Sequence, residues 1–214
     1  MRNMGCEDFS KAMGVKEEMN AEAEITDIQR FSVHDGTGIR TLVFFKGCPL
    51  RCIWCHNPET QRKQPQLFFI ESKCIHCGAC ILACPKQAVS VKGEEIVTDR
   101  TRCVECGECV KVCFSGARKI VGRKYTVEEG IEKVLQDEVF YKYSGGGVTL
   151  SGGDPVAHIE FACELLLRLK QLGIHTAIET CGVCCEEDFT RLLENVDLVL
   201  FDLKHTDTEM HKKY

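Results

Sequence analysis

The sequence predicts an α/β fold interrupted by a cysteine-rich insert, and two observations carry this prediction. Short runs of β-branched and aromatic residues alternate with helical segments over most of the 214 residues. Eleven of the 16 cysteines fall between positions 48 and 113. Because strands separated by helices imply right-handed crossovers, we expect the strands to form a parallel sheet.

Four short apolar runs are the strand candidates, and each is followed by polar or metal-ligating residues. In parallel α/β folds the carboxyl ends of the strands share one rim, where ligands bind. Four separate motifs are therefore expected to meet at one face of the sheet. The runs are Thr41 to Lys46, Val148 to Ser151, Ile174 to Glu179 and Leu198 to Leu203.

Three helices are expected among these strands. Thr126 and Glu129 have the spacing of a capping box, and Pro155 suits the first position of a helix that stops before Gly173. The first 25 residues and the last few are expected to be frayed. The helices run from Thr126 to about Tyr141, from Pro155 to before Gly173, and from about Cys185 to Asn195.

The predicted organisation has four parts. Residues 1–24 form an N-terminal extension, and residues 25–59 carry the first strand and a three-cysteine loop. Residues 60–124 form the compact insert, because their apolar content is low and their glycine, proline and cysteine content is high. Residues 125–214 continue the α/β fold.

Composition excludes several classes of protein. A net charge of -5 with no long basic run argues against a nucleic-acid partner, and the basic segment 118–124 is expected to be a solvated connector. No run approaches the roughly 18 apolar residues of a membrane span, and the N-terminus lacks the apolar segment of a signal peptide. A cytoplasmic location follows as the expectation. In that reducing compartment clustered cysteines usually hold metal.

Two four-cysteine runs with the spacing C-x2-C-x2-C-x3-C repeat about 29 residues apart within the insert. In this pattern three thiolates bind one 4Fe-4S cluster, and the fourth binds the other cluster. Zinc modules are the alternative, but they usually separate two C-x2-C pairs by a dozen or more residues. The insert resembles a bacterial two-cluster ferredoxin, although Phe114 replaces the proline found after the first run (Pro85). The expected ligand sets are Cys74, Cys77, Cys80 and Cys113 for one cluster, and Cys103, Cys106, Cys109 and Cys84 for the other.

A third group, Cys48, Cys52 and Cys55, offers only three thiolates. Three ligands leave one iron of a 4Fe-4S cluster open, and an open metal position is typical of a reactive site. The alternative is a zinc ion whose fourth ligand is His56.

The stretch DGTGIRTLVFFKGCPLRCIWCHNP, residues 35–58, resembles the signature of glycyl-radical-enzyme activating enzymes, a branch of the radical S-adenosylmethionine superfamily. The match includes Arg40, Trp54 before the last cysteine, and His56 after it; Thr37 stands where many members have proline. The resemblance implies a six-stranded partial (β/α) barrel. This chain supplies about four of the six βα units, so we expect it to be C-terminally truncated.

The resemblance also implies contacts with S-adenosylmethionine. Gly152, Gly153 and Asp154 match the family's Gly-Gly-Glu element, which meets the cofactor's amino group; with aspartate the contact becomes indirect or the strand end lies closer. Glu179 and Thr180 match a monovalent-cation site. The remaining matched positions are Trp54, Cys55 and His56, with Trp54 toward the adenine, and Asp202, Leu203 and Lys204 of the family's Asp-x-Lys element.

The activity implied by the resemblance is the formation of a 5′-deoxyadenosyl radical, through the catalytic cluster on Cys48, Cys52 and Cys55, that takes a hydrogen atom from a glycine of a partner enzyme. The implied partners are a glycyl radical enzyme and an electron donor such as flavodoxin or ferredoxin. An alternative is a two-cluster ferredoxin-type electron-transfer protein that carries an inactive barrel fragment. Dehydratase, decarboxylase, lyase and formate-lyase partners all have similar activators, so the type of partner stays open.

Overall fold

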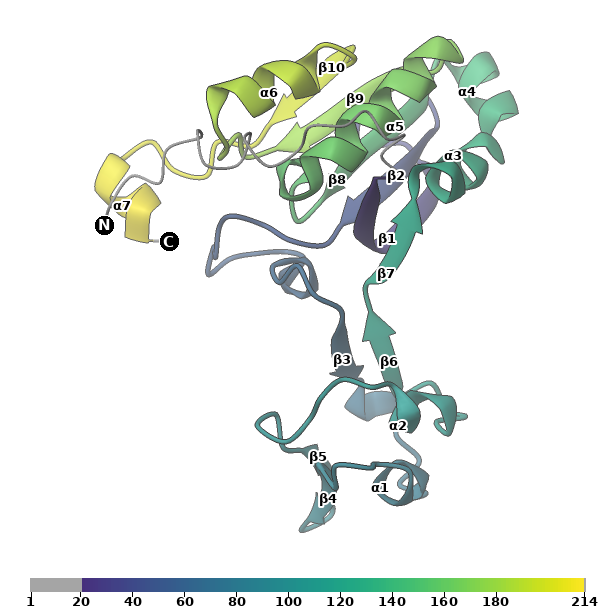
Figure 1. Ribbon diagram of the computed structural model, residues 1–214, viewed down its shortest axis with the longest axis vertical. Coiled ribbons are helices and arrows are strands. Elements are labelled where there is room, and N and C mark those ends of the chain that lie inside the picture. The colour runs from purple at the N-terminus through teal and green to yellow at the C-terminus, as the bar shows by residue number, and fades with distance from the viewer. Residues whose placement is uncertain (1–20, 214) are drawn as a thin grey trace, which may run out of the picture. The chain divides into compact units, whose positions relative to one another are not determined.

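The computed structural model describes residues 21–213, which form two compact units (Figure 1). The first comprises the described residues up to Lys63 and those from Lys124 onward, and the second comprises Gln64–Arg123. No helix in the described part of the chain is long and apolar enough to cross a membrane.

A six-stranded mixed sheet forms the centre of the first unit. Four neighbouring strands are parallel, and they are the four predicted runs, so the predicted parallel sheet is confirmed. The strand order is β10 (Leu198–Phe201), β9 (His175–Thr180), β8 (Gly147–Gly152), β2 (Arg40–Phe45), β1 (Glu22–Ser32) and β7 (Arg123–Thr126).

The strand β1 was not among the predicted strands. It pairs antiparallel with β2, with Ile25 opposite Phe45 and Ile28 opposite Val43. It begins at Glu22, so the predicted start of the core at residue 25 and the predicted fraying up to that residue are wrong for residues 22–24. Only Ala23, Ile25 and Ser32 of β1 are buried, which explains why its apolar pattern is weak. At the other end, the predicted fraying is replaced by a helix, α7 (Thr208–Lys213).

The predicted helix from Thr126 to Tyr141 is two helices, α3 (Val127–Leu135) and α4 (Glu138–Ser144). The capping box at its start is confirmed, because Thr126 Oγ1 accepts the Glu129 N–H and Glu129 accepts the Thr126 N–H. The break falls at Asp137, whose buried carboxylate accepts from Arg30 Nε at 2.9 Å and from Thr41 Oγ1 at 2.8 Å. These hydrogen bonds to β1 and β2 hold the chain between the two helices against the sheet.

The other two predicted helices are confirmed. Pro155 opens a 3-10 turn, η5 (Pro155–His158), that continues as α5 (Ile159–Gln171). The chain leaves α5 through Gly173 in the left-handed region, at a φ of 71°. The third helix is α6 (Glu186–Leu193). Helices α3, α5 and α6 cover one face of the sheet (Figure 1), and the core between them includes Val43, Phe45, Val148, Leu150, Ile178, Val134, Phe161, Leu165, Leu166 and Leu192.

The second unit contains two small antiparallel sheets and two single-turn helices. Strand β3 (Gln66–Phe69) pairs with β6 (Arg118–Val121), and β4 (Val89–Lys92) forms a hairpin with β5 (Glu95–Thr98). The helices are α1 (Ala79–Leu82) and α2 (Glu108–Lys111).

The backbone of this unit repeats with the 29-residue period of the cysteines, which confirms the internal repeat. Residues 29 apart share unusual positive φ angles: 55° at both His76 and Glu105, and 72° and 80° at Gly78 and Gly107. The expectation of a solvated connector at 118–124 holds for Lys119, Arg123 and Lys124, which are exposed, but it is wrong for Arg118, whose side chain is buried, and the segment forms parts of β6 and β7.

Candidate functional site

A cavity of about 320 Å³ lies at the carboxyl ends of the four parallel strands. All four predicted motifs contribute to its wall, as the shared rim of a parallel sheet predicts. The lining residues are Cys48, Leu50, Cys52, Trp54, Cys55, His56, Asn57, Thr60, Gln61, Ser151, Gly152, Gly153, Asp154, Glu179, Thr180, Cys181, Asp202 and Lys204.

The three-cysteine loop follows β2 and is anchored at both ends. The Gly47 N–H donates to Thr60 O at 2.6 Å, and the Cys48 N–H donates to Gln61 O at 3.2 Å. Thr60 ends the short 3-10 turn η3 (Pro58–Thr60), which follows the loop. These two hydrogen bonds join the start of the loop to the residues that follow its end. All three cysteines of the loop line the cavity.

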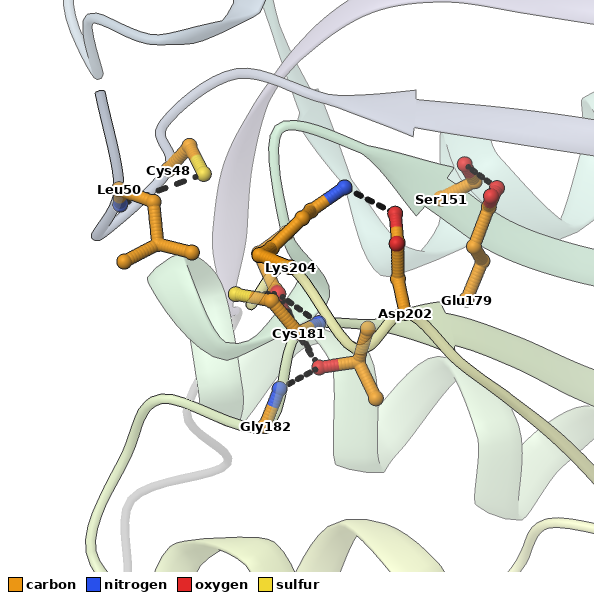
Figure 2. Close-up of polar contacts among 10 residues, drawn as sticks. Cys48, Leu50, Ser151, Glu179, Cys181, Gly182, Asp202 and Lys204 are labelled. Atoms are coloured by element: carbon orange, nitrogen blue, oxygen red, sulfur yellow. Dashed lines mark hydrogen bonds and ion pairs between the residues drawn. The ribbon is translucent and has the colours of Figure 1, made fainter. Parts of the chain in front are cut away.

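Cys181 also lines the cavity, although no role was predicted for it. It directly follows Thr180 at the end of β9, and its thiol lies 3.0 Å from Asp154 Oδ2. The neighbouring Cys181 side chain lowers the pKa of Cys48 to about 7 although burial acts in the opposite direction, and the Leu50 N–H, which lies 3.4 Å from Cys48 Sγ, adds to this effect (Figure 2). The nearby Cys48, burial and the Asp154 charge all raise the pKa of Cys181. The only indication in the sequence that Cys181 belongs to the site was its position directly after a strand end.

Gly152 and Gly153 are required by the chain's own packing. Gly152 has a φ of 102°, and a Cβ there would lie 2.4 Å from the Phe45 nitrogen. A Cβ on Gly153 would lie 2.1 Å from Gly47 O. These glycines let the end of β8 lie directly against the end of β2 and the start of the cysteine loop.

The carboxylate of Asp154 is 1% exposed and joins two strand ends. Its Oδ1 accepts the Val156 N–H at 3.1 Å and so caps η5. Its two oxygens also lie 2.9 Å from Thr180 Oγ1 and 2.9 Å from the Cys181 nitrogen. With the Cys181 thiol as a fourth donor, the carboxylate is fully engaged within the protein, which fits the indirect alternative for its cofactor contact.

Two polar pairs face the cavity from β8, β9 and the end of β10 (Figure 2). The Ser151 hydroxyl donates to Glu179 Oε2 at 2.5 Å. Lys204 forms an ion pair with Asp202, and this contact raises the lysine pKa although burial acts in the opposite direction. The pairs place two carboxylates and one ammonium group on the same wall.

The structure brings most, but not all, of the predicted site residues together. Trp54 lines the cavity with half of its surface exposed, and His56 lines it as well. Leu203 is 64% exposed and is not among the cavity residues. Among the cysteines for which no ligand role is predicted, Cys163 packs against the core, while Cys184 and Cys185 lie outside the cavity lining. Cys6 lies outside the described residues.

The donor set fits an iron-sulfur cluster with a polar organic ligand beside it. Three sulfur atoms are the ligands that such clusters use, and the remaining wall offers carboxylates, a lysine and backbone groups at the strand ends. Within residues 21–213, no three His, Cys, Asp or Glu side chains are close enough to share a single metal ion. A cluster of four irons spaces its thiolate ligands further apart than one ion does.

Two smaller cavities in the second unit each contain four cysteines. They divide the eight cysteines into the same two sets that the cluster pattern predicts, with the fourth cysteine of each run exchanged. One cavity is lined by Cys74, Cys77, Cys80 and Cys113, and the other by Cys84, Cys103, Cys106 and Cys109.

The two exchanged cysteines are surrounded by hydrogen-bond donors. Burial opposes their ionisation, yet the pKa values of Cys84 and Cys113 lie below the ordinary value because backbone N–H groups point at their sulfurs. The Ala88 N–H lies 3.2 Å from Cys84 Sγ, and the Ser115 hydroxyl lies 3.7 Å from Cys113 Sγ. Such donors favour thiolates, the form in which cysteine binds metal.

Three relatives, each named as an activating enzyme, are similar to most of this chain. The trans-4-hydroxy-L-proline dehydratase activating enzyme of Clostridioides difficile is 48% identical over 192 residues, covering 89% of this chain and 63% of the relative. The choline trimethylamine-lyase activating enzyme of Oleidesulfovibrio alaskensis is 46% identical, over 89% of this chain and 62% of the relative. The benzylsuccinate synthase activating enzyme of Thauera aromatica is 48% identical, over 87% and 58%. The chain thus spans about three fifths of the length of these relatives.

Residues 42–214 match the radical SAM superfamily, and this segment contains every residue of the cavity at the strand ends. The mixed sheet with four parallel strands fits part of a radical-SAM fold. The chain therefore belongs to the radical SAM superfamily, whose members use a 4Fe-4S cluster and S-adenosylmethionine.

Proposed function

We propose that this protein is an activating enzyme that installs a glycyl radical on a partner enzyme. The observation that carries the proposal is the single cavity in which the three-cysteine loop faces the ends of β8, β9 and β10. The relatives named as activating enzymes, at 46–48% identity, support the same reading.

Cys48, Cys52 and Cys55 would hold the catalytic cluster. When bound, this cluster supplies the electron that cleaves S-adenosylmethionine to methionine and the 5′-deoxyadenosyl radical. The chain holds the three thiols in place through the backbone hydrogen bonds of Gly47 to Thr60 and of Cys48 to Gln61. Cys52, which is 8% exposed, is the most buried of the three.

The other cavity residues would bind and orient S-adenosylmethionine. Asp154 acts as a positioning residue, because its carboxylate holds Thr180 and Cys181 in place at the end of β9. Lys204 offers a cation to the carboxylate of the cofactor, and the exposed ring of Trp54 offers a stacking surface to the adenine. Oxygen atoms of Glu179 and Thr180 would supply the monovalent-cation site, Asp202 would hold the ammonium group of Lys204, and His56 would contribute to the wall beside Cys55.

The second unit would hold two further 4Fe-4S clusters, in the manner of a two-cluster ferredoxin. Its support is the division of the eight cysteines between two cavities. These clusters would pass electrons from a donor such as flavodoxin or ferredoxin. With the catalytic cluster the chain would hold about twelve irons.

The test is anaerobic reconstitution with iron and sulfide, followed by reduction with dithionite in the presence of S-adenosylmethionine. We expect 5′-deoxyadenosine to form, and Cys52→Ala to abolish it while about eight irons remain. The matched control is Cys163→Ala, which removes a cysteine at the edge of the hydrophobic core and should leave product formation unchanged. No product from fully reconstituted protein would contradict the proposal.

The alternative, a two-cluster electron-transfer protein with an inactive barrel fragment, is favoured by one observation. The second unit is compact and has its own small core. Under this alternative the chain binds about eight irons, and Cys52→Ala leaves the iron content unchanged.

A further inference from the structure

Arg118 breaks the symmetry of the repeated unit in a way that the cluster pattern does not require. It stands 29 residues after Val89, so the two occupy the same position in the repeat, and they begin β6 and β4 respectively. Both side chains are buried, Val89 at 3% and Arg118 at 2% exposure. The first copy therefore buries an apolar side chain where the second buries a cation.

The guanidinium of Arg118 is incompletely paired within the protein. Its Nη1 donates to Thr98 Oγ1 at 2.9 Å, and its Cζ lies 4.8 Å from the centroid of the Phe69 ring. Its Nε and Nη2 atoms are buried and have no hydrogen-bond partner in the part of the chain that the structure describes. A buried charge with unmatched donors is costly unless a negative group compensates it.

The groups that line a cavity with Arg118 and can carry negative charge are cysteines of one set. Arg118 lines the cavity of Cys74, Cys77, Cys80 and Cys113. The charge of Arg118 therefore lies in the same cavity as these four cysteines.

We propose that Arg118 is a buried counter-charge for the set Cys74, Cys77, Cys80 and Cys113 and raises the reduction potential of the cluster that this set holds. This inference rests on the proposal that the second unit holds two 4Fe-4S clusters. On reduction each cluster takes one electron from the reductant, no bond forms or breaks, and the cluster becomes one unit more negative. A fixed positive charge stabilises that reduced state, because net charge and hydrogen bonds to sulfur set cluster potentials. Arg118 would thus act through its positive charge and would not be a ligand of the cluster.

The experiment uses the full chain with Cys48, Cys52 and Cys55 changed to alanine. Only the clusters of the second unit then contribute to the iron content and to the electron paramagnetic resonance signal. Arg118→Met removes the charge and keeps much of the side-chain length, while Arg118→Lys keeps the charge. Lys119→Met is the matched control, because it removes an exposed charge from the next position of β6. Iron content is measured first, and midpoint potentials then come from anaerobic dithionite titrations followed by electron paramagnetic resonance.

We expect about eight irons per chain in every variant, four for each cluster. Arg118→Met should shift the potential of at least one cluster to a more negative value, with Arg118→Lys and Lys119→Met close to the parent. Loss of clusters from Arg118→Met but not from Arg118→Lys would also support a requirement for the charge. Unchanged potentials in a fully loaded Arg118→Met protein, or equal loss of clusters from both variants, would overturn the inference. A parent protein that binds no iron in this unit would instead refute the clusters themselves.

Discussion

Asp154 connects more parts of the site than any other single side chain described above. Its carboxylate caps η5 and binds the hydroxyl of Thr180 and the backbone of Cys181, so it fixes the ends of β8 and β9 relative to each other. Because it is buried, each donor would lose its partner if the carboxylate were removed. The sequence around Asp154 predicted that it is a site residue. It did not predict which groups donate hydrogen bonds to its carboxylate.

Asp154→Ala should destabilise the protein by about 3 kcal/mol, since several buried donors lose their acceptor at once. Denaturant unfolding of the anaerobic protein measures this loss. Glu187→Ala, which removes an exposed carboxylate from α6, should stay within about 0.5 kcal/mol of the parent. A stable Asp154→Ala protein would show that the carboxylate does not hold the two strand ends together.

His158 makes the stability depend on pH. Burial lowers its pKa to about 4, and its Nε2 lies 2.8 Å from Lys46 O. Between pH 6.5 and 4 the unfolded chain binds a proton that the folded chain does not, so the free energy of unfolding falls as pH decreases through this window. The loss is about 2 kcal/mol after allowance for partial solvent access. His158→Gln, which can still donate to Lys46 O, should lack this part of the pH dependence; an unchanged profile would contradict the assignment.

Among the elements, those with strong local signals could be predicted from sequence, and those that depend on distant partners could not. The parallel strands are continuous apolar runs, and α3 begins at a capping box, so both were predictable. The break between α3 and α4 depends on Arg30 and Thr41, which lie about a hundred residues earlier in the chain. Strand β1 is mostly polar and is held by its pairing with β2.

The capping box of α3 should contribute about 1 kcal/mol to stability. Thr126→Ala removes the acceptor of the Glu129 N–H and is expected to lower the free energy of unfolding by that amount. Thr190→Ala is the matched control, because the Thr190 hydroxyl donates within α6 to Glu186 O and caps nothing. Equal effects of the two substitutions in urea unfolding would argue against a specific contribution of the cap.

At the scale of the whole molecule, the two units differ in how they are stabilised. The first has a core built from strands and helices, whereas the fully buried core of the second is Leu67, Cys80, Val89, Ile96 and Cys109. A core of this size rarely supports a fold of about 60 residues without disulfides or metal. The spacing of the cysteines predicted the two sets in this unit, but the burial of Arg118 became visible only in the structure.

If the second unit holds the proposed clusters, their removal by oxidation and chelation should unfold this unit first. Hydrogen exchange should show loss of protection in residues 64–123, while β2, β8 and β9 stay protected. Protein treated with chelator alone, under anaerobic conditions, is the control. Retained protection in the second unit after complete loss of iron would show that its small core is sufficient.

The proposed function requires that the cavity at the strand ends holds a cluster that S-adenosylmethionine binds directly. The most direct measurement is the electron paramagnetic resonance spectrum of the dithionite-reduced protein before and after addition of S-adenosylmethionine. We predict that the cofactor changes the signal of one cluster in the parent chain and changes nothing in Cys52→Ala, whose two remaining clusters lie in the second unit. A spectrum of the fully reconstituted parent that S-adenosylmethionine leaves unaltered would contradict the claim.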